Sequence, residues 1–549
     1  MPVKQGNEEM SGAGWWVAGF IYLSAILGSV GLGQPSLWID EAHSVEFAGL
    51  PTAWLVVLNS AVRDAYPPLY FLLLHAWMKL GAGEAWLRTL SMVFHLSSIP
   101  LAYLVGRRLA LAHAGIFSAA LLAISPFHLA FAREIRMYSM VEFLSLASVW
   151  GLLAWVQDRS SLGWRLMLAA GVALIYTHFM GALLLLCEGA WLWGLRKDEA
   201  IWRGSLRWAG WTAVLFLPWL PLFLKAVLVT HGYGAEAPFL RLGWYFLGVL
   251  GAGFGQAWWV MAAAVAALLA LAWGGFESIK ARPVRLRYAA ARPSVRPKGS
   301  RPSARRFLAW WAFAPVLLEL ALGLLGKPVF GERTLICSTP AWLILSACAI
   351  TESPRFRAAL GAVVLGLLAG FGFAHTIGYI IPTAPSSREA MRMVAEKYRS
   401  GDAILHSSTV TYHPVQEYYL RRSGARLKSY LISSSGSFRG GRLGNWIRDK
   451  WRSYRWVLDP GGVIESGSDK YRLEEENFAR RGFDRVWYFR TTGEGLRRLW
   501  LLVPFNFYAP KPALLEETPF TNNARVARSY GKLREWRFPG LRLELWERR

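Results

Sequence analysis

Long apolar runs separated by short polar loops fill the first two thirds of the chain. Several of them reach about 18 residues or more, which is the length a helix needs to cross the hydrocarbon core of a bilayer. Within lipid, such a run can satisfy its backbone hydrogen bonds only as a helix. The pattern therefore predicts a polytopic α-helical membrane domain. The clearest runs are 14–33, 114–131, 308–325 and 358–381.

The orientation of this domain follows from its basic loops. Residues 279–306 hold ten Lys/Arg and no acidic residue, which predicts a cytoplasmic loop under the positive-inside rule. Working outward from this loop gives about eleven spans, with the N-terminus cytoplasmic. The short cytoplasmic loops then carry 20 Lys/Arg and the short external loops only 7. The expected spans are 14–33, 87–109, 113–131, 138–157, 164–178, 180–195, 208–228, 244–275, 308–326, 335–351 and 358–381.

One apolar segment, 67–81, is too short to follow this scheme. It begins with Pro67-Pro68 and contains His75 and Lys79, and apolar runs of this length are often interfacial. We expect a juxtamembrane helix here, within one long external loop over 34–86. The first run, flanked by Glu8 and Glu9 without a basic segment or small-residue cleavage site, is expected to be a retained helix.

The tail, 383–549, alternates helix-like and strand-like patterns and predicts an extracytoplasmic α/β domain. It follows a membrane domain that we place at 1–382. We expect helices over 386–400 and 415–422, and strands over 402–408, 454–460 and 485–491. The three cysteines, Cys187, Cys337 and Cys348, all lie in apolar runs without metal or disulfide spacing, so we expect small core residues.

Composition and charge narrow the class of partner. The chain is 54% apolar, above the 45–50% that is usual for a soluble protein, and its net charge is +25. The tail contributes 31 Lys/Arg against 18 Asp/Glu. Nucleic acid is one partner for such charge. The membrane setting favours anionic lipid headgroups instead, and we expect no nucleic acid.

Two adjacent carboxylates, Asp40 and Glu41, follow the first apolar run, and Asp64 and Glu46 lie in the same external loop. A carboxylate here could take the proton of an attacking hydroxyl or amine, or it could bind a divalent metal. The alternative is a solvated loop with no chemistry. On composition alone these interpretations carry equal weight.

Cationic and aromatic residues gather in three other external segments. Arginine binds phosphate oxygens through two parallel hydrogen bonds, so these segments are candidates for holding a phosphate group, with headgroup anchoring as the alternative for the arginines. His178 is more often a polar helix cap than a catalyst. Glu188 and Glu319 lie inside expected spans, and no role follows for them from the sequence. The candidates are Arg133, Arg136 and Tyr138 in FAREIRMYS, His178 in YTHFMG, and Lys327 and Arg333 in KPVFGERTLI.

Acids from the first external loop and bases from three later loops thus share one side of the membrane. The chain resembles the polytopic glycosyltransferases of the GT-C fold, in particular bacterial members of the protein O-mannosyltransferase and lipid A aminoarabinose transferase superfamily, families 39 and 83. The resemblance covers the first third of the chain. Later, only GERTL at 331–335 is similar, with Thr334 where the family has Tyr. The matching stretches are WIDEAHS at 38–44, residues 64–109, AISPFHLAFAREIRMYSM at 123–140, and YTHFMG at 176–181.

The resemblance implies a polyprenyl-phosphate sugar donor, used on the outer face of the cytoplasmic membrane. It assigns the role of base to Asp40, with Glu41 beside it and Asp64 as a second loop carboxylate, and it assigns Arg133 and Arg136 to the donor phosphate. The implied reaction inverts the anomeric carbon with one general base, unlike the acid–base pair of a glycosidase. The acceptor would be an envelope protein, lipid or polysaccharide. Participation of a divalent metal is open, because members of the wider fold differ.

Two other functions remain as alternatives. A transporter or flippase would place its substrate site near the bilayer midplane, with repeats and broken helices. An envelope assembly protein would instead use the basic tail to hold anionic polymers. The sugar, the donor lipid, the acceptor and the oligomeric state are not readable from the sequence.

Overall fold

The computed structural model describes most of the helical region and parts of the tail. Contacts group the chain into two compact units. The first comprises Met1–Ser29, Tyr66–Tyr70 and Thr89–His375, and the second Val30–Ala65, Phe71–Arg88 and Thr376–Arg549. We call them the helical unit and the loop–sheet unit; the domain boundary at residue 382 stays a prediction. The described residues are 2–62, 66–109, 112–229, 304–324, 334–351, 386–407, 409–423, 427–431, 483–491, 530–538 and 541–549.

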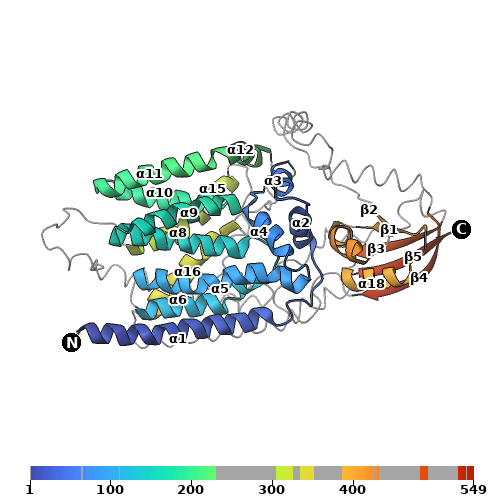
Figure 1. Ribbon diagram of the computed structural model, residues 1–549, viewed down its shortest axis with the longest axis horizontal. Coiled ribbons are helices and arrows are strands. Elements are labelled where there is room, and N and C mark those ends of the chain that lie inside the picture. The colour runs from blue at the N-terminus through green and yellow to red at the C-terminus, as the bar shows by residue number, and fades with distance from the viewer. Residues whose placement is uncertain are drawn as a thin grey trace. The chain divides into compact units, whose positions relative to one another are not determined.

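The helical unit is a bundle of long helices whose axes run side by side (Figure 1). It contains most of α5, and two short 3-10 turns, η1 and η4, interrupt it. Its elements are α1 (Pro2–Ser29), α5 (Glu84–Leu109), α6 (Ala112–Ile124), α7 (Pro126–Ala132), α8 (Tyr138–Asp158), α9 (Ser161–Thr177), α10 (Gly181–Gly194), α11 (Glu199–Phe216), η1 (Leu217–Trp219), α12 (Leu220–Val229), α15 (Ala304–Leu324), η4 (Thr334–Cys337) and α16 (Thr339–Thr351).

Three of the described helices are long and apolar enough to cross a membrane by themselves: α1 over Gly12–Ser29, α5 and α8. A fourth candidate is the pair α6 and α7, which is bent by 58°. The bend follows from Pro126 at the first position of α7, because proline cannot donate the hydrogen bond that would continue α6. The spans expected at 244–275 and 358–381 lie outside the described residues.

Several of the other expected spans correspond to shorter helices: 164–178 and 180–195 are α9 and α10, and 335–351 contains η4 and α16. The span expected at 208–228 is divided among α11, η1 and α12, and that expected at 308–326 lies largely on α15, which has 21 residues. Glycines allow α8 and α9 to approach closely, because a Cβ at Gly151 would lie 2.6 Å from the backbone nitrogen of Met167. Close backbone approach at small residues is the usual way in which helices pack inside membranes.

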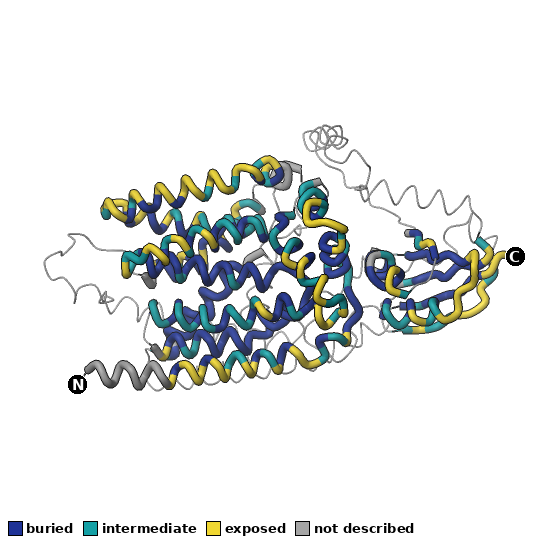
Figure 2. The backbone as a smooth tube through the Cα atoms, viewed as in Figure 1, coloured by how far each residue is buried: buried dark blue, intermediate teal, exposed yellow. Residues whose placement is uncertain are grey.

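Burial differs along and between the helices of this unit. In Figure 2, α8 is almost wholly buried, whereas α1 and α11 have largely exposed faces. Large apolar side chains lie on those faces, among them Trp15 (81% exposed), Trp16 (62%) and Trp211 (53%). Exposed apolar surface of this kind suits contact with lipid tails rather than with water. Cys187, Cys337 and Cys348 are buried free thiols, as expected.

The loop–sheet unit begins with three short helices, α2 (Ile39–Ala48), α3 (Ala53–Val62) and α4 (Leu69–Met78), although Leu69 and Tyr70 are grouped with the helical unit. The segment 67–81 was expected to be a short juxtamembrane helix, and α4 has ten residues. Such a helix is about 15 Å long, roughly half the thickness of the hydrocarbon core. It is therefore too short to span, as predicted.

The rest of this unit is a five-stranded mixed sheet with helices. The sheet has the order β2-β1-β3-β5-β4; β1 pairs parallel with β2 and β3, and β5 pairs antiparallel with β3 and β4. Its core includes Leu405, Val486 and Tyr488. The elements are α18 (Ser387–Lys397), β1 (Ala403–His406), α19 (Thr409–Pro414), the π-helical turn η5 (Val415–Tyr419), α20 (Leu420–Ser423), β2 (Lys428–Leu431), β3 (Arg485–Thr491), β4 (Tyr530–Phe538) and β5 (Leu541–Arg548).

Most of the sequence-based expectations for the tail are confirmed. The helix expected over 386–400 is α18, the strand over 402–408 contains the fully buried β1, and the strand over 485–491 is β3. The helix expected over 415–422 is present as η5 and α20. The strand expected at 454–460 lies outside the described residues.

Candidate active site

The two adjacent carboxylates that follow the first apolar run begin helix α2. Trp38 is extended at the N-cap, and Asp40 and Glu41 occupy the first turn, where the helix dipole favours negative charge. The Glu41 carboxylate accepts the backbone N–H of Trp38 at 3.4 Å, which is one half of a capping box. Helix formation here thus follows from the local sequence.

The two carboxylates have different surroundings although they are neighbours. Glu41 is 1% exposed and forms a bidentate ion pair with Arg88, with Nε–Oε1 and Nη2–Oε2 distances of 2.8 and 2.7 Å. Such a planar two-bond pair holds both side chains in one geometry. Asp40, in contrast, is only half-buried, and its backbone carbonyl accepts the hydroxyl of Ser44 at 3.0 Å. The geometry therefore assigns Glu41 to holding the helix and leaves Asp40 at its partly accessible side.

The α1–α2 loop, residues 30–38, is held by the same arginine and by a second one. Arg88 Nη1 donates to the carbonyls of Leu32 and Pro35 at 2.8 and 3.1 Å. Arg388 of α18 donates to the carbonyls of Gly33 and Pro35 at 2.9 and 3.0 Å. Four backbone acceptor contacts thus anchor the segment that leads into α2.

Arg388 also forms an ion pair with Glu84, which orients its guanidinium toward the loop. Tyr419 of η5 accepts the backbone N–H of Leu37 at 2.7 Å. Burial raises the pKa of the Tyr419 hydroxyl well above its ordinary value, and nearby Glu84 raises it further. The hydroxyl therefore keeps its proton at neutral pH. The tail helices thus hold the entry to α2, within the loop–sheet unit.

The helical unit contains the predicted phosphate-binding arginines. Arg133 caps the C-terminus of α7 and is fully buried, and its Nη1 donates to the carbonyl of Leu27 at 3.2 Å. Arg136 is 4% exposed, and its backbone carbonyl accepts the Ser91 hydroxyl at 2.9 Å. In the described part of the helical unit, these two are the buried arginines. A buried arginine among apolar helices is costly and is a functional candidate by default.

Two tyrosine rings lie close to the Arg136 guanidinium. Its guanidinium carbon lies 5.6 Å from the ring centre of Tyr66 and 5.7 Å from that of Tyr138, which is within cation–π range. The ring of Tyr138 lies 6.1 Å from that of His178. His178 caps the C-terminus of α9, and its Nδ1 accepts the backbone N–H of Met180 at 3.2 Å. The structure therefore brings together three predicted site residues, from the turn before α8, the start of α8 and the C-cap of α9: Arg136, Tyr138 and His178.

Some predicted site residues lie outside the described residues, namely Asp64, Lys327 and Arg333. Glu188 and Glu319, to which the sequence assigns no role, are both buried. Glu188 in α10 accepts the Ser148 hydroxyl at 2.8 Å, and Glu319 lies in α15.

Several residues of this region were not predicted. Tyr66 lies in the DAYPPLY stretch, so its place beside a candidate acid was a usable signal. No local signal marks Arg88, Arg388 or Tyr419, because their partners are separated from them by 47 to more than 300 positions. His43 and Glu46 of α2 lie beside His413 of α19, and imidazole and carboxylate groups are of the kinds that bind zinc.

Comparison with known proteins identifies the fold. No family model matches the sequence, and no curated protein matches it. Among solved structures, ArnT from Cupriavidus metallidurans in the apo state is similar with a TM-score of 0.61 and 12% identity, over 97% of this chain and 98% of that one. The same protein bound to undecaprenyl phosphate has a TM-score of 0.59 and 13% identity, over 96% and 98%.

A third structure, the arabinofuranosyltransferase AftD from Mycobacteria, has a TM-score of 0.52 and 16% identity, and covers 97% of this chain and 40% of that one. At sequence identities of 12–16%, the structural similarity shows the fold alone. The similarity to ArnT extends over the whole length of both chains, helices and tail alike. The resemblance found in the first third of the sequence is thereby confirmed as a resemblance in architecture, and the chain has the GT-C fold.

Proposed function

We propose that the chain is a membrane glycosyltransferase that moves a sugar from a polyprenyl-phosphate donor to an envelope lipid, glycan or protein. The observation that carries this proposal is the full-length likeness to ArnT, a protein with a structure bound to undecaprenyl phosphate. The transfer would take place on the outer face of the cytoplasmic membrane. Its sugar is a hexose or a pentose.

In this proposal Asp40 is the general base. A hydroxyl or amine of the acceptor attacks the anomeric carbon, and its proton passes to the Asp40 carboxylate. The bond from the anomeric carbon to the donor phosphate oxygen breaks in the same displacement, and polyprenyl phosphate departs with the electron pair. The configuration at the carbon is inverted. Because Asp40 is half-buried at the start of α2, it suits contact with an acceptor better than buried Glu41 does.

Glu41 then acts as a positioning residue. Its ion pair with Arg88 holds the first turn of α2, and Arg88 also holds the carbonyls of Leu32 and Pro35. A base must lie within hydrogen-bond reach of the proton that it takes. A fixed helix start keeps Asp40 in such a position. Exact placement matters because errors of about 1 Å can reduce rates about 10²-fold.

The donor phosphate is assigned to cationic residues of the helical unit. Arg133 and Arg136 are buried arginines, and an arginine in a low-dielectric site stabilises the negative charge that develops on a departing phosphate. Tyr138 and His178 lie beside Arg136 and would contact the substrate. Lys327 and Arg333 are proposed as further phosphate contacts, and Asp64 as a second loop carboxylate.

The proposal keeps the topology expected from the charge pattern. Eleven spans place the N-terminus and the loop 279–306 in the cytoplasm, and the loop 34–86 and the tail domain 383–549 outside. A nucleotide sugar from the cytoplasm is not needed, because a lipid-linked sugar carries its own leaving group. Membrane lipids surround the spans and accompany the donor.

The test is a transfer assay with purified protein in liposomes, a panel of radiolabelled polyprenyl-phosphate sugars and envelope extract. We expect Asp40→Asn to lower transfer about 10² to 10⁴-fold, the range for losing a general base, with unchanged insertion and thermal unfolding. The matched control is Glu199→Gln, the same change at a carboxylate that is 75% exposed on α11. It should transfer at the wild-type rate.

Two results would contradict the proposal. Full transfer by Asp40→Asn would remove the base assignment. Absence of covalent transfer from every donor by folded wild-type protein, together with counterflow of an intact lipid-linked sugar, would identify a transporter instead.

A further inference from the structure

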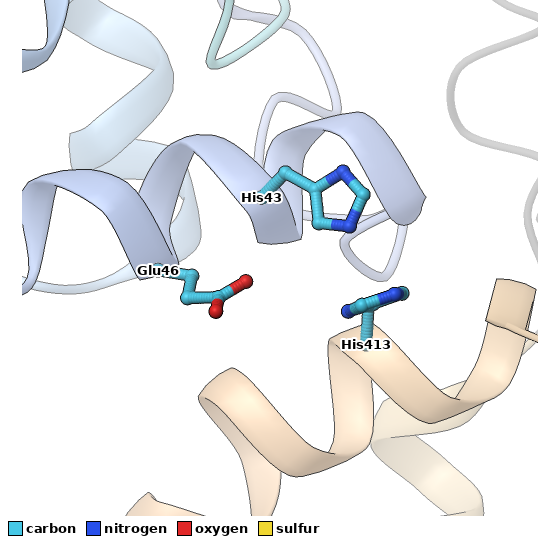
Figure 3. A group of neighbouring side chains, drawn as sticks. All are labelled: His43, Glu46 and His413. Carbon is cyan, nitrogen blue, oxygen red and sulfur yellow. The ribbon is translucent and has the colours of Figure 1, made fainter. Parts of the chain in front are cut away.

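A group of three potential metal ligands lies about one helical turn beyond Asp40 and includes none of the residues assigned to sugar transfer. His43 and Glu46 project from α2, His413 projects from α19, and all three point toward one another between the two helices (Figure 3). Their ligand atoms lie within 4.8 Å of one another. The rings of His43 and His413 are 4.2 Å apart, edge to face. Both helices belong to the loop–sheet unit.

The spacing on α2 suits joint binding of one ion. Residues three apart lie on the same face of a helix, so His43 and Glu46 present an imidazole and a carboxylate to one point. His413 supplies the second imidazole from the facing helix and is 6% exposed. His413 lies two positions before the π-helical turn Val415–Tyr419, with Pro414 between them. Such turns are frequent at functional sites.

We propose that His43, Glu46 and His413 form a zinc site that fastens α2 to α19. Two imidazoles and one carboxylate are a ligand set known for zinc, with bonds of about 2.0–2.2 Å. Calcium and magnesium prefer oxygen ligands throughout, so this set selects zinc or a similar transition metal. Three protein ligands leave the fourth tetrahedral position to water.

The ligands stand on elements that are held in place independently of the ion. The start of α2 is held by the Glu41–Arg88 ion pair. Beyond His413, Tyr419 of η5 accepts the N–H of Leu37, just before α2. Binding one ion would bring the ligand atoms from within 4.8 Å of one another to the spacing of about 3.3 Å that follows from tetrahedral bonds of this length. A site on rigid helices is better defined than one on loops.

A bound zinc ion would thus connect α2, in the loop that follows the first apolar run, to α19 in the tail. Asp40 lies one helical turn before His43, so fixing His43 also limits the movement of the segment that carries Asp40. Zinc would act here on the stability of α2 and not on the transferred sugar. The inference therefore does not rest on the proposed glycosyltransferase activity.

The experiment measures metal directly in full-length protein purified without a polyhistidine tag, stripped with chelator and reloaded with zinc. We expect one equivalent of zinc in the wild type by mass spectrometry, and loss of it in His43→Ala. Reloading with Co²⁺ should produce the visible absorption of a tetrahedral cobalt centre in the wild type alone. The control is His113→Ala, which removes an exposed imidazole from α6 and should retain the metal.

A second variant separates metal binding from folding. His413→Cys replaces one zinc ligand by another and should keep the equivalent of zinc, whereas His413→Ala should lose it. Zinc should also raise the unfolding temperature of the wild type and leave that of His43→Ala unchanged, because an ion that binds only the folded state stabilises it. Absence of zinc uptake by the wild type, or equal uptake by His43→Ala and His113→Ala, would overturn the inference. Neither readout depends on sugar transfer.

Discussion

Two buried carboxylates in the loop–sheet unit and two in the helical unit have different kinds of partner. In the loop–sheet unit, Glu41 and Asp402 each form an ion pair with an arginine. In the helical unit, Glu142 contacts the imidazole of His95 at 3.2 Å and Glu188 accepts the hydroxyl of Ser148. Arginine is always charged, whereas histidine and serine can be neutral.

This difference has a physical reason. A fixed charge among apolar helices in a bilayer costs several kcal/mol or more, so a carboxyl group there is better matched by partners that do not impose a charge. In the loop–sheet unit, a buried arginine–carboxylate pair specifies geometry, because both groups must meet or remain uncompensated. The helical unit also buries Arg133 and Arg136, the two arginines for which contact with the donor phosphate is proposed.

The largest expected effect tests the ion pairs of the loop–sheet unit. Glu41→Gln should lower the free energy of unfolding of this unit by about 3–5 kcal/mol, because Arg88 would remain as an uncompensated buried charge. Urea unfolding, followed by protease cleavage of the tail, measures the change. The double variant Glu41→Leu/Arg88→Met should recover most of the loss. If Glu41→Gln lowered the free energy of unfolding no more than a surface substitution does, the proposed difference between the partners of buried carboxylates in the two units would be contradicted.

An intermediate effect concerns His406, a group in the sheet that is held by neutral partners. Its ring nitrogens contact the hydroxyls of Thr411 and Ser429 at 3.1 and 3.0 Å, and burial lowers its pKa to about 3. Between pH 6.5 and 3 the unfolded chain takes up a proton here that the folded chain does not, so stability falls as the pH falls. At pH 5 the expected loss relative to neutral pH is roughly 2 kcal/mol.

The measurement for His406 is the free energy of unfolding of the loop–sheet unit across this pH range. His406→Gln should be less stable at neutral pH but should lack that part of the pH dependence. If stability depended on pH equally in the variant and the wild type, His406 would take up its proton in the folded state. His406 would then not resemble the buried groups of the helical unit that have neutral partners.

The smallest expected effect is in the helical unit. Glu188→Gln keeps the oxygen that accepts from Ser148, and no arginine depends on the lost charge in this contact. We therefore expect a change below about 1 kcal/mol, measured as the shift in thermal unfolding in detergent. A loss as large as that of Glu41→Gln would show that the charge of Glu188 is balanced by a cation, and would remove the distinction between the two units.

The sequence by itself determined those features that depend on neighbouring residues. The apolar runs located α1, α5 and α8, the shortness of 67–81 identified a helix that cannot span, and the patterns at 386–400 and 485–491 located α18 and β3. Asp40 and Glu41 were found because acids next to an apolar run are conspicuous. Local periodicity reflects which face of an element is buried, and it is present in the sequence before any contact forms.

Only the tertiary structure decided which residues meet across long separations. Asp40 and Glu41 look equivalent in the sequence, and it is Arg88, 47 positions later, that makes Glu41 part of the framework. The grouping of His43 and Glu46 with His413, and the sheet order β2-β1-β3-β5-β4, likewise depend on chain closure over long loops. Such pairings are set by packing and charge complementarity in the folded chain, which leave no periodic trace in the sequence.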